Sequence, residues 1–353
     1  MEKVIAGPID SYDTQKIKAF IEKGLRETGL AIAGRVLVKP NLLSGKVPDR
    51  AVTTHPVFLE ALIELLKDYS CSVYLGDSPG YESLERVLRI GQYTDILERF
   101  GVHITPFTNE IVKRIDGVSP YREFLFGEDP DRYDHVINVP KLKTHGMMGM
   151  TLAVKNTYGF IRGFAKGRWH LRAGTDKSLF ASILVDIHRI AAPRVSVLDG
   201  ILGMSGDGPS NGTPVDLGLI ALSPSAAALD DFIEQRLCPQ AFHPVTECAR
   251  VNGLLEPYEV IDLGIPPVPA FFPMPRSCAA DWNIPSPIKR VLRNIMVKKP
   301  KPDRRNCQLC GICAKVCPAQ AIEIRNDTLQ FNYSACIRCY CCQEMCPHDA
   351  IRV

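Results

Sequence analysis

The sequence predicts an N-terminal α/β domain with a largely parallel sheet flanked by helices, followed by a small C-terminal α+β domain. Over residues 1–262, short runs rich in β-branched residues alternate with segments of helical periodicity, which is typical of parallel sheets. Near the other end, nine of the 13 cysteines lie between residues 307 and 346. A cytosolic chain has little use for so many disulfides, so the spacing of these thiols carries the information.

Length and composition limit the classes of function. The chain has 353 residues, 46% of them hydrophobic, which suits two ordinary globular domains. Its net charge of +3 does not favour a dedicated nucleic-acid binder. We expect no membrane span, because no window approaches about 18 uncharged apolar residues. The start, MEKVIAGPID, carries Glu2 and Asp10 and lacks an apolar core, so we do not expect a signal peptide there.

The alternation gives the elements of the large domain in order. Strands are predicted at 35–39, 71–75, 102–105, 135–139, 194–198 and 217–221, and helices at 13–27, 56–69, 92–100, 178–189 and 226–236. Residues 263–305 form a Pro-rich linker that ends in a predicted basic amphipathic helix at 288–299. Such a helix suits a membrane surface or an acidic partner. We favour the simpler interpretation that it packs on the main domain while its Lys and Arg side chains are solvated.

Polar side chains follow four of the predicted strands. They are Lys39 and Asn41, then Asp77 and Ser78, then Lys141, Lys143 and His145 in a predicted loop, and finally Asp199 before the Gly-rich segment GMSGDGPSNG. Ligands in open α/β sheets bind outside the carboxyl ends of the strands, so these residues predict one shared site. The alternative is that surface loops are polar in any protein.

The segment 141–172 carries the strongest charge pattern. No Asp or Glu occurs between residues 135 and 175, where Lys155, Asn156 and His170 add to the basic residues already named. A stretch of one sign attracts a carboxylate or phosphate anion. A solvated basic face is the alternative, but apolar residues are interleaved with the polar ones. Neither a P-loop nor a dinucleotide-binding motif is present.

The cysteines between 307 and 346 form a repeat. Each half has the spacing C-x2-C-x2-C-x3-C followed by proline, and the two halves are offset by 29 residues. In this pattern three thiolates wrap one cubane cluster and the fourth ligates the other cluster. We therefore predict two [4Fe–4S] clusters, one held by Cys307, Cys310, Cys313 and Cys346 and the other by Cys336, Cys339, Cys342 and Cys317. Structural zinc is the alternative, although zinc sites use pairs of cysteines.

One further thiol, Cys341, stands beside the predicted ligand Cys342. We expect it to be a packed bystander, with a swapped ligand as the minor alternative.

The motifs of the large domain resemble the family called domain of unknown function 362 (DUF362). They are VLVKPNLL (36–43), TTHP (53–56), GDSPG (76–80), NVPKLKTH (138–145), TLAVKNTYG (151–159) and LDGILGMSGDGP (198–209). Where relatives often carry an acidic residue before GDGP, this chain has Ser205. Residues 306–353 resemble a bacterial-type two-cluster ferredoxin. The Lys-Pro, Thr-His-Pro and Gly-Asp-Ser order is also similar to nickel-pincer lactate racemases. The family resemblance implies a shared fold and site but no settled reaction.

We expect an iron–sulfur oxidoreductase in which the clusters exchange electrons with an anionic small molecule. Lysines 39, 141, 143 and 155 would hold the anion, and His145 or His170 would move a proton. Asn41 and Asn156 would orient the substrate, while Asp77 and Asp199 would position the basic groups. One alternative is a ferredoxin-type electron carrier whose large domain docks a redox partner. A second is an isomerase whose clusters sense redox state. Because exposed low-potential clusters are sensitive to oxygen, we further expect a cytoplasmic protein of an anaerobic setting.

Overall fold

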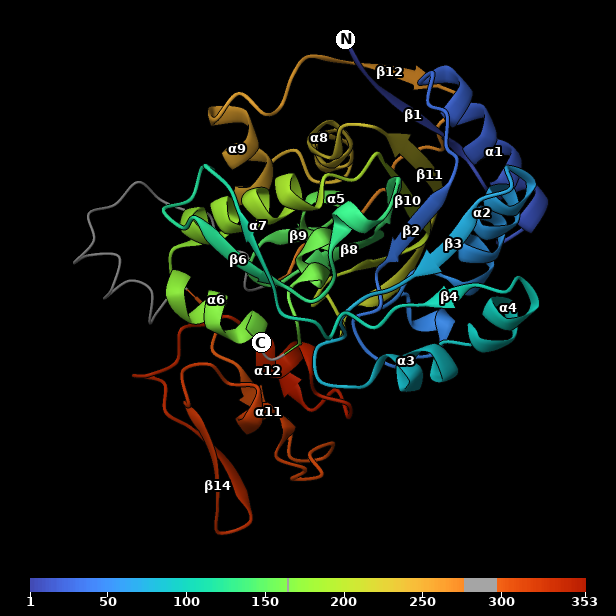
Figure 1. The fold of residues 1–353 in the computed structure, drawn as a ribbon. Coiled ribbons are helices and arrows are strands. Elements are labelled where there is room, and N and C mark those ends of the chain that lie inside the picture. The colour runs from blue at the N-terminus through green and yellow to red at the C-terminus, as the bar shows by residue number, and fades with distance from the viewer. Residues whose placement is uncertain (164, 276–296) are drawn as a thin grey trace.

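The computed structural model describes residues 1–163, 165–275 and 297–353 (Figure 1). Its large domain is built on a mixed sheet with the strand order β12-β1-β11-β10-β7-β2-β3-β4, to which β8 and β9 are attached beside β10. The C-terminal module lies against one end of this domain, at the bottom of Figure 1. The predicted fold class is confirmed.

Half of the sheet is parallel. It comprises β10 (Val195–Ser205), β7 (His135–Val139), β2 (Arg35–Pro40), β3 (Ser72–Leu75) and β4 (His103–Ile104). The other half contains β11 (Thr213–Ser223), which runs antiparallel to β10 and to β1 (Glu2–Pro8), and β12 (Tyr258–Asp262), which runs parallel to β1. The carboxyl ends of β2, β3 and β7 therefore lie at one edge of the sheet.

Alternating side chains of the central strands pack into two separate hydrophobic cores, one on each face of the sheet. On β2, Val36 and Val38 pack in the core beneath α1 (Thr14–Glu27) and α2 (Pro56–Asp68), whereas Leu37 packs in the core on the other face. That second face is covered by α5 (Ala153–Asn156), α7 (Lys177–Ala191), α8 (Ala226–Leu237) and α9 (Pro244–Val251). This is the period-2 burial expected of a strand with apolar layers on both sides.

All six strands and five helices predicted in the large domain are confirmed, with ends that differ by a few residues. The structure adds β1, β12, a hairpin of β5 (Ile111–Arg114) and β6 (Glu123–Phe126), and the helices α3 (Leu84–Ile90), α5, α6 (Ala165–Ala173) and α9. It also adds short 3-10 turns at Pro48–Arg50, Pro130–Arg132 and Thr157–Phe160. The predicted helix at 92–100 appears as α4 (Thr94–Arg99).

Two predicted loops are wrong. Residues 141–145 form the buried strand β8 (Lys141–His145), which pairs with β10 and with β9 (Gly149–Thr151). Similarly, β10 continues through the start of the Gly-rich segment to Ser205, with a register shift between Gly200 and Leu202. The polar side chains misled the prediction, because a strand buried on both faces is normally apolar.

Residues 263–275, the described start of the predicted Pro-rich linker, contain no helix or strand. Most of the predicted basic helix at 288–299 lies outside the described residues. Among the described residues, no helix is both long enough and apolar enough to cross a membrane.

The C-terminal module repeats its backbone conformation as well as its sequence. It contains α11 (Ile312–Lys315) and α12 (Cys341–Glu344), the hairpin of β14 (Ile322–Arg325) and β15 (Thr328–Phe331), and the pair β13 (Lys301–Pro302) and β16 (Ile351–Arg352). Left-handed residues occur at positions 29 apart, at Leu309 and Arg338 and again at Gln320 and Asp349. Tight loops of this kind let closely spaced cysteines turn toward a common centre.

Candidate functional site

A cavity of about 430 Å³ lies between the carboxyl edge of the sheet and the C-terminal module. We call it the interdomain cavity. Seven of the predicted site residues line it: Asn41, Asp77, Ser78, Lys143, Lys155, Asn156 and His170. The module supplies the opposite wall, which includes Lys315, Cys317, Cys341, Glu344 and Met345. Lys39, Lys141, His145 and Asp199 are not part of the lining.

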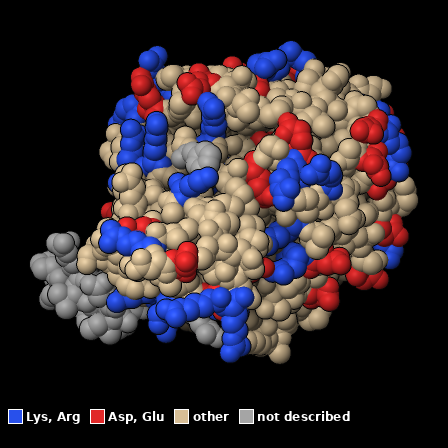
Figure 2. Space-filling model, turned by 90° about the horizontal axis from the view of Figure 1, so that it is seen from below, with Lys and Arg blue, Asp and Glu red and all other residues tan. Residues whose placement is uncertain are grey.

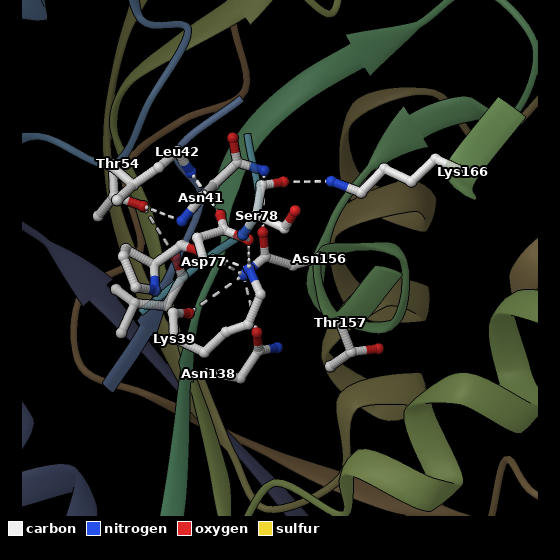
Figure 3. A network of polar contacts seen from close by, with 12 residues as sticks. Lys39, Asn41, Leu42, Thr54, Asp77, Ser78, Asn138, Asn156, Thr157 and Lys166 are labelled. Carbon is white, nitrogen blue, oxygen red and sulfur yellow. Dashed lines mark hydrogen bonds and ion pairs between the residues drawn. The ribbon is translucent and has the colours of Figure 1, made fainter. Parts of the chain in front are cut away.

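A polar network joins three segments of the large domain (Figure 3), and several of its members line the cavity. The Lys39 ammonium contacts Asp77 Oδ1 at 2.9 Å, and both side chains are almost fully buried. Asp77 also accepts hydrogen bonds from the backbone N–H groups of Leu42 and Ser78, each at 2.8 Å. A Cβ at Gly159 would lie 2.1 Å from Asp77 Oδ1, so only glycine lets this turn approach the ion pair.

Two asparagines continue the network toward the cavity. Asn41 donates to Asn156 Oδ1 at 2.9 Å, and Asn156 donates to Asn138 Oδ1 at 2.8 Å. These bonds fix the amide orientations. Lys143 donates to Asn41 Oδ1 at 2.9 Å and to the carbonyl oxygen of Val52 at 2.6 Å. Neither partner is a carboxylate, so the positive charge of Lys143 is not neutralised by these contacts.

Lysines dominate the charge of the cavity. Burial, followed by the nearby Lys155 charge, lowers the pKa of Lys143 well below its usual value. Burial also lowers the pKa of Lys155. In the described part of the chain, Lys155 has no carboxylate within ion-pair distance; its recorded contact is with the Tyr158 ring, whose centroid is 6.0 Å away. An ammonium group without a counterion in a buried cavity favours an incoming anion.

His145 connects the sheet to the module. Its Nδ1 accepts hydrogen bonds from the backbone N–H groups of Met147 and Met148, at 3.0 and 3.1 Å. The proton of the neutral ring is therefore on Nε2, which lies 2.8 Å from Glu344 Oε1. Burial lowers the pKa of His145 to about 4. Burial alone would raise the pKa of Glu344, but His145 and Lys155 together hold it below its usual value.

His170 and Lys166 line the cavity from α6. The His170 ring stacks on Phe180 with 4.2 Å between centroids, and its buried Nδ1 has no hydrogen-bond partner. Burial lowers its pKa to about 3, so the ring is neutral. Lys166 donates to the carbonyl oxygen of Ser78, and burial lowers its pKa to about 8.

Lys141 and Asp199 belong to a different network. Lys141 Nζ lies 2.7 Å from Asp199 Oδ2 and 2.8 Å from the Tyr12 hydroxyl, which itself donates to Asp199 Oδ1 at 2.9 Å. The backbone N–H of His55 donates to Asp199 Oδ2 at 2.9 Å. These contacts join β8 to β10 and to the turn before α2, outside the cavity lining.

The two predicted sets of cysteines are gathered as two sets of neighbouring thiols. Burial raises the pKa of Cys313 to about 11, and the adjacent Cys346, Cys310 and Cys307 also act on it. These are the four members of the first predicted set. Cys317 lies within the electrostatic range of Cys339 and Cys336, across the repeat. Cys317 and Cys346 each accept a backbone N–H at 3.3 Å, from Ala321 and Ala350 respectively. Convergent soft thiols with N–H donors to sulfur fit iron–sulfur clusters.

The module is held to the large domain by direct contacts. Asp349 lies 3.1 Å from Lys46 Nζ and 3.0 Å from Arg50 Nη2. Gln343 donates to the carbonyl oxygen of Asp207 at 3.3 Å. A Cβ at Gly80 would lie 2.0 Å from Met345 Sδ, so glycine permits the close approach of the two domains.

Several lining residues were missed by sequence reasoning. Glu344 and Met345 lie within the second cysteine motif, whose spacing indicates only cluster ligands. Nothing in their sequence context signals a role in the other domain. Lys166 and Arg168 lie in the basic segment that drew attention, but nothing distinguished them from solvated charges.

The comparisons with known proteins identify both domains. The family described as "Domain of unknown function (DUF362)" matches residues 36–233, which is more than half of the chain. The family described as "4Fe-4S dicluster domain" matches residues 306–350. The C-terminal module is therefore an iron–sulfur domain of the ferredoxin type, which indicates electron transfer.

Relatives in other organisms match one part of the chain or the other. A thylakoid-associated protein of Synechocystis sp. is 36% identical over 196 residues, covering 56% of this chain and 60% of that protein. NADH-quinone oxidoreductase subunit I of Pelobacter propionicus is 42% identical, covering 13% of this chain and 32% of its own length. Hydrogenase-4 component A of Escherichia coli is 49% identical, covering 11% of this chain and 19% of its own length. This chain thus spans less than two thirds of each relative.

Among solved structures, the lactate racemase apoprotein from Thermoanaerobacterium thermosaccharolyticum matches with a TM-score of 0.43 and 12% identity. The match covers 65% of this chain and 57% of that one.

Proposed function

We propose that this chain, which belongs to the DUF362 family, moves single electrons between its C-terminal iron–sulfur domain and an anionic small molecule bound in the interdomain cavity. The observation that carries the proposal is that Cys317, a predicted cluster ligand, lines the same cavity as Lys143 and Lys155. An electron leaving that cluster would meet a ligand in the cavity directly.

The charge of the lining supports an anionic ligand. Five basic side chains line the cavity, Lys143, Lys155, Lys166, Arg168 and Lys315, against the carboxylates of Asp77 and Glu344. Asp77 is already paired with Lys39, and Glu344 faces His145. A carboxylate or phosphate group near Lys155 would supply the missing counterion. Asn41 and Asn156, whose orientations are fixed by hydrogen bonds, would present polar atoms to the same ligand.

Proton movement is assigned to Glu344 and His170 rather than to His145 directly. His145 is fully buried and does not line the cavity, and both of its ring nitrogens are engaged. It therefore acts through Glu344, as a positioning residue. His170 presents a neutral ring with an unpartnered Nδ1, which suits exchange of a proton with a ligand.

The iron–sulfur part of the proposal assigns two [4Fe–4S] clusters to the two predicted sets of thiols. Bound there, they would supply or accept one electron at a time. Electrons gained or lost by the anion are exchanged with a partner protein through the same clusters. The solvent-exposed thiol of Cys310 implies a cluster open to oxygen, so we propose an anaerobic, cytoplasmic setting. We also propose domain limits near residues 262 and 305.

The test is anaerobic reoxidation of the reduced protein. The clusters are reduced by a limiting amount of dithionite and mixed with a panel of small carboxylates and phosphates, and their visible absorbance is followed. At least one anion should reoxidise the clusters rapidly in the wild type. Lys155→Met should abolish this reaction while the iron content stays the same.

The matched control is Lys177→Met in the first turn of α7, outside the cavity lining, which should react like the wild type. Equal rates in the Lys155 variant and the wild type, or no reoxidation by any anion in the panel, would favour the electron-carrier alternative.

A further inference from the structure

The two predicted clusters differ in what surrounds them. Of their eight thiols, Cys310 is the exposed one, and it does not line the interdomain cavity. Cys317 of the other set does line it. If electrons pass between the cavity and a partner, as the proposed function requires, the cluster at Cys310 is the one that a partner can approach.

The surface beside Cys310 is basic. Between residues 297 and 353 the sequence has nine Lys and Arg but five Asp and Glu. Lys301, Arg304 and Arg305 are exposed and immediately precede Cys307. Among the described residues, none of these three side chains lies within ion-pair distance of a carboxylate. Arg352 extends the same surface from β16, which pairs with β13 at Lys301.

Most carboxylates of the module already have a basic or histidine partner. Asp303 is paired with Arg352 at 2.8 Å, and Glu323 with Arg325 at 3.0 Å. Asp349 is turned toward Lys46 and Arg50 of the large domain, and Glu344 is buried against His145. Figure 2, which looks onto the side where the module lies, shows Lys and Arg gathered there with few acidic residues between them.

We propose that this basic surface docks a small acidic electron-carrier protein, and that electrons enter or leave the chain at the Cys307–Cys310–Cys313–Cys346 cluster. The partner's centre would exchange one electron with this cluster, and the Cys317 cluster would exchange it with the cavity. Complementary charge accelerates such encounters by about 10- to 1000-fold at low salt. Electrons would then travel between the basic surface and the cavity through the two clusters in series.

The test uses the hydroquinone of an acidic flavodoxin as the probe. One-electron oxidation yields the flavin semiquinone, whose absorbance is followed by stopped flow as the protein's cluster is reduced. The second-order rate constant of the wild type should fall steeply with added salt. Arg304→Glu with Arg305→Glu should lower it at least tenfold at low salt and remove most of the salt dependence.

The control carries the same change of charge at Lys23 and Arg26, two exposed residues of α1. Lys23→Glu with Arg26→Glu should stay within about twofold of the wild type. A salt-independent wild-type rate, or equal slowing in both double variants, would overturn the proposal. The salt dependence of the wild-type rate constant tests the proposal even if a variant fails to retain iron. No cavity ligand is present in this assay, so its outcome is independent of the anion-reduction test.

Discussion

Replacing Lys141 with methionine tests whether the buried network around Asp199 is structural. Lys141 and Asp199 are 1% and 0% exposed, and 2.7 Å separates their charged atoms. The variant keeps the apolar volume of the side chain but leaves the Asp199 carboxylate buried without its cation. Breaking one partner of a buried pair costs about 3–5 kcal/mol, which for a domain of this size is roughly 6–10 °C in melting temperature.

The assay is anaerobic thermal unfolding of the full chain, followed by far-UV circular dichroism at a fixed scan rate. Lys16→Met is the matched control, since Lys16 contacts Asp10 at 3.1 Å on the surface, with side chains 53% and 79% exposed. Water screens the charges of an exposed pair, so this variant should melt close to the wild type.

A double variant completes the argument. Lys141→Met with Asp199→Asn removes both charges, and the amide keeps an acceptor for the His55 N–H. It should recover at least half of the loss, because the penalty comes from the unpaired carboxylate. The opposite result would refute this reasoning: the Lys141 variant melts like the wild type, but its reduced clusters are no longer reoxidised by any anion. Lys141 would then act in anion binding rather than in stability.

Three further predictions follow from the cavity and the cysteines. Lys155→Met should weaken anion binding about 10- to 100-fold, because a hydrogen bond to a charged group contributes about 1.5–3 kcal/mol. Calorimetric titration with sulfate measures this affinity, and an unchanged value would contradict the prediction. Since the pKa of Lys166 is about 8, its ammonium is charged below that pH and neutral above it, so sulfate affinity should fall as pH rises through 8. The fall should disappear in Lys166→Met. Cys317→Ser should contain one cluster fewer than the wild type, whereas Cys341→Ser should keep both clusters. Iron analysis and electron paramagnetic resonance measure the number of clusters. Loss of a cluster in the Cys341 variant would show that Cys341 is a ligand.

Local sequence patterns were sufficient for most of the fold. The β-branched run at 35–39 and the amphipathic segment at 13–27 each contain their own signal, and Asp13 caps α1 by accepting from two backbone N–H groups. The strand at 141–145 could not be found in this way. Its lysines donate hydrogen bonds to Asp199 and Asn41, and its histidine lies 2.8 Å from the Glu344 carboxylate; all three partners come from distant segments of the sequence.

The candidate site was predictable in part for a related reason. Residues at the carboxyl ends of parallel strands lie close together whatever conformation the loops adopt. Asn41, Asp77, Ser78 and Lys143 accordingly line one cavity. No rule of this kind tells which surface a second domain will cover. The placement of Glu344 beside His145 depends on that docking, and neither residue carries a local sign of it.

The position of Glu344 also couples the two domains. This residue stands in α12 between Cys342 and Cys346, which we assign to different clusters. The same short helix therefore carries a predicted cluster ligand, Cys342, and a side chain of the cavity wall, Glu344. A substitution that displaces α12 would disturb the cluster and the anion site together.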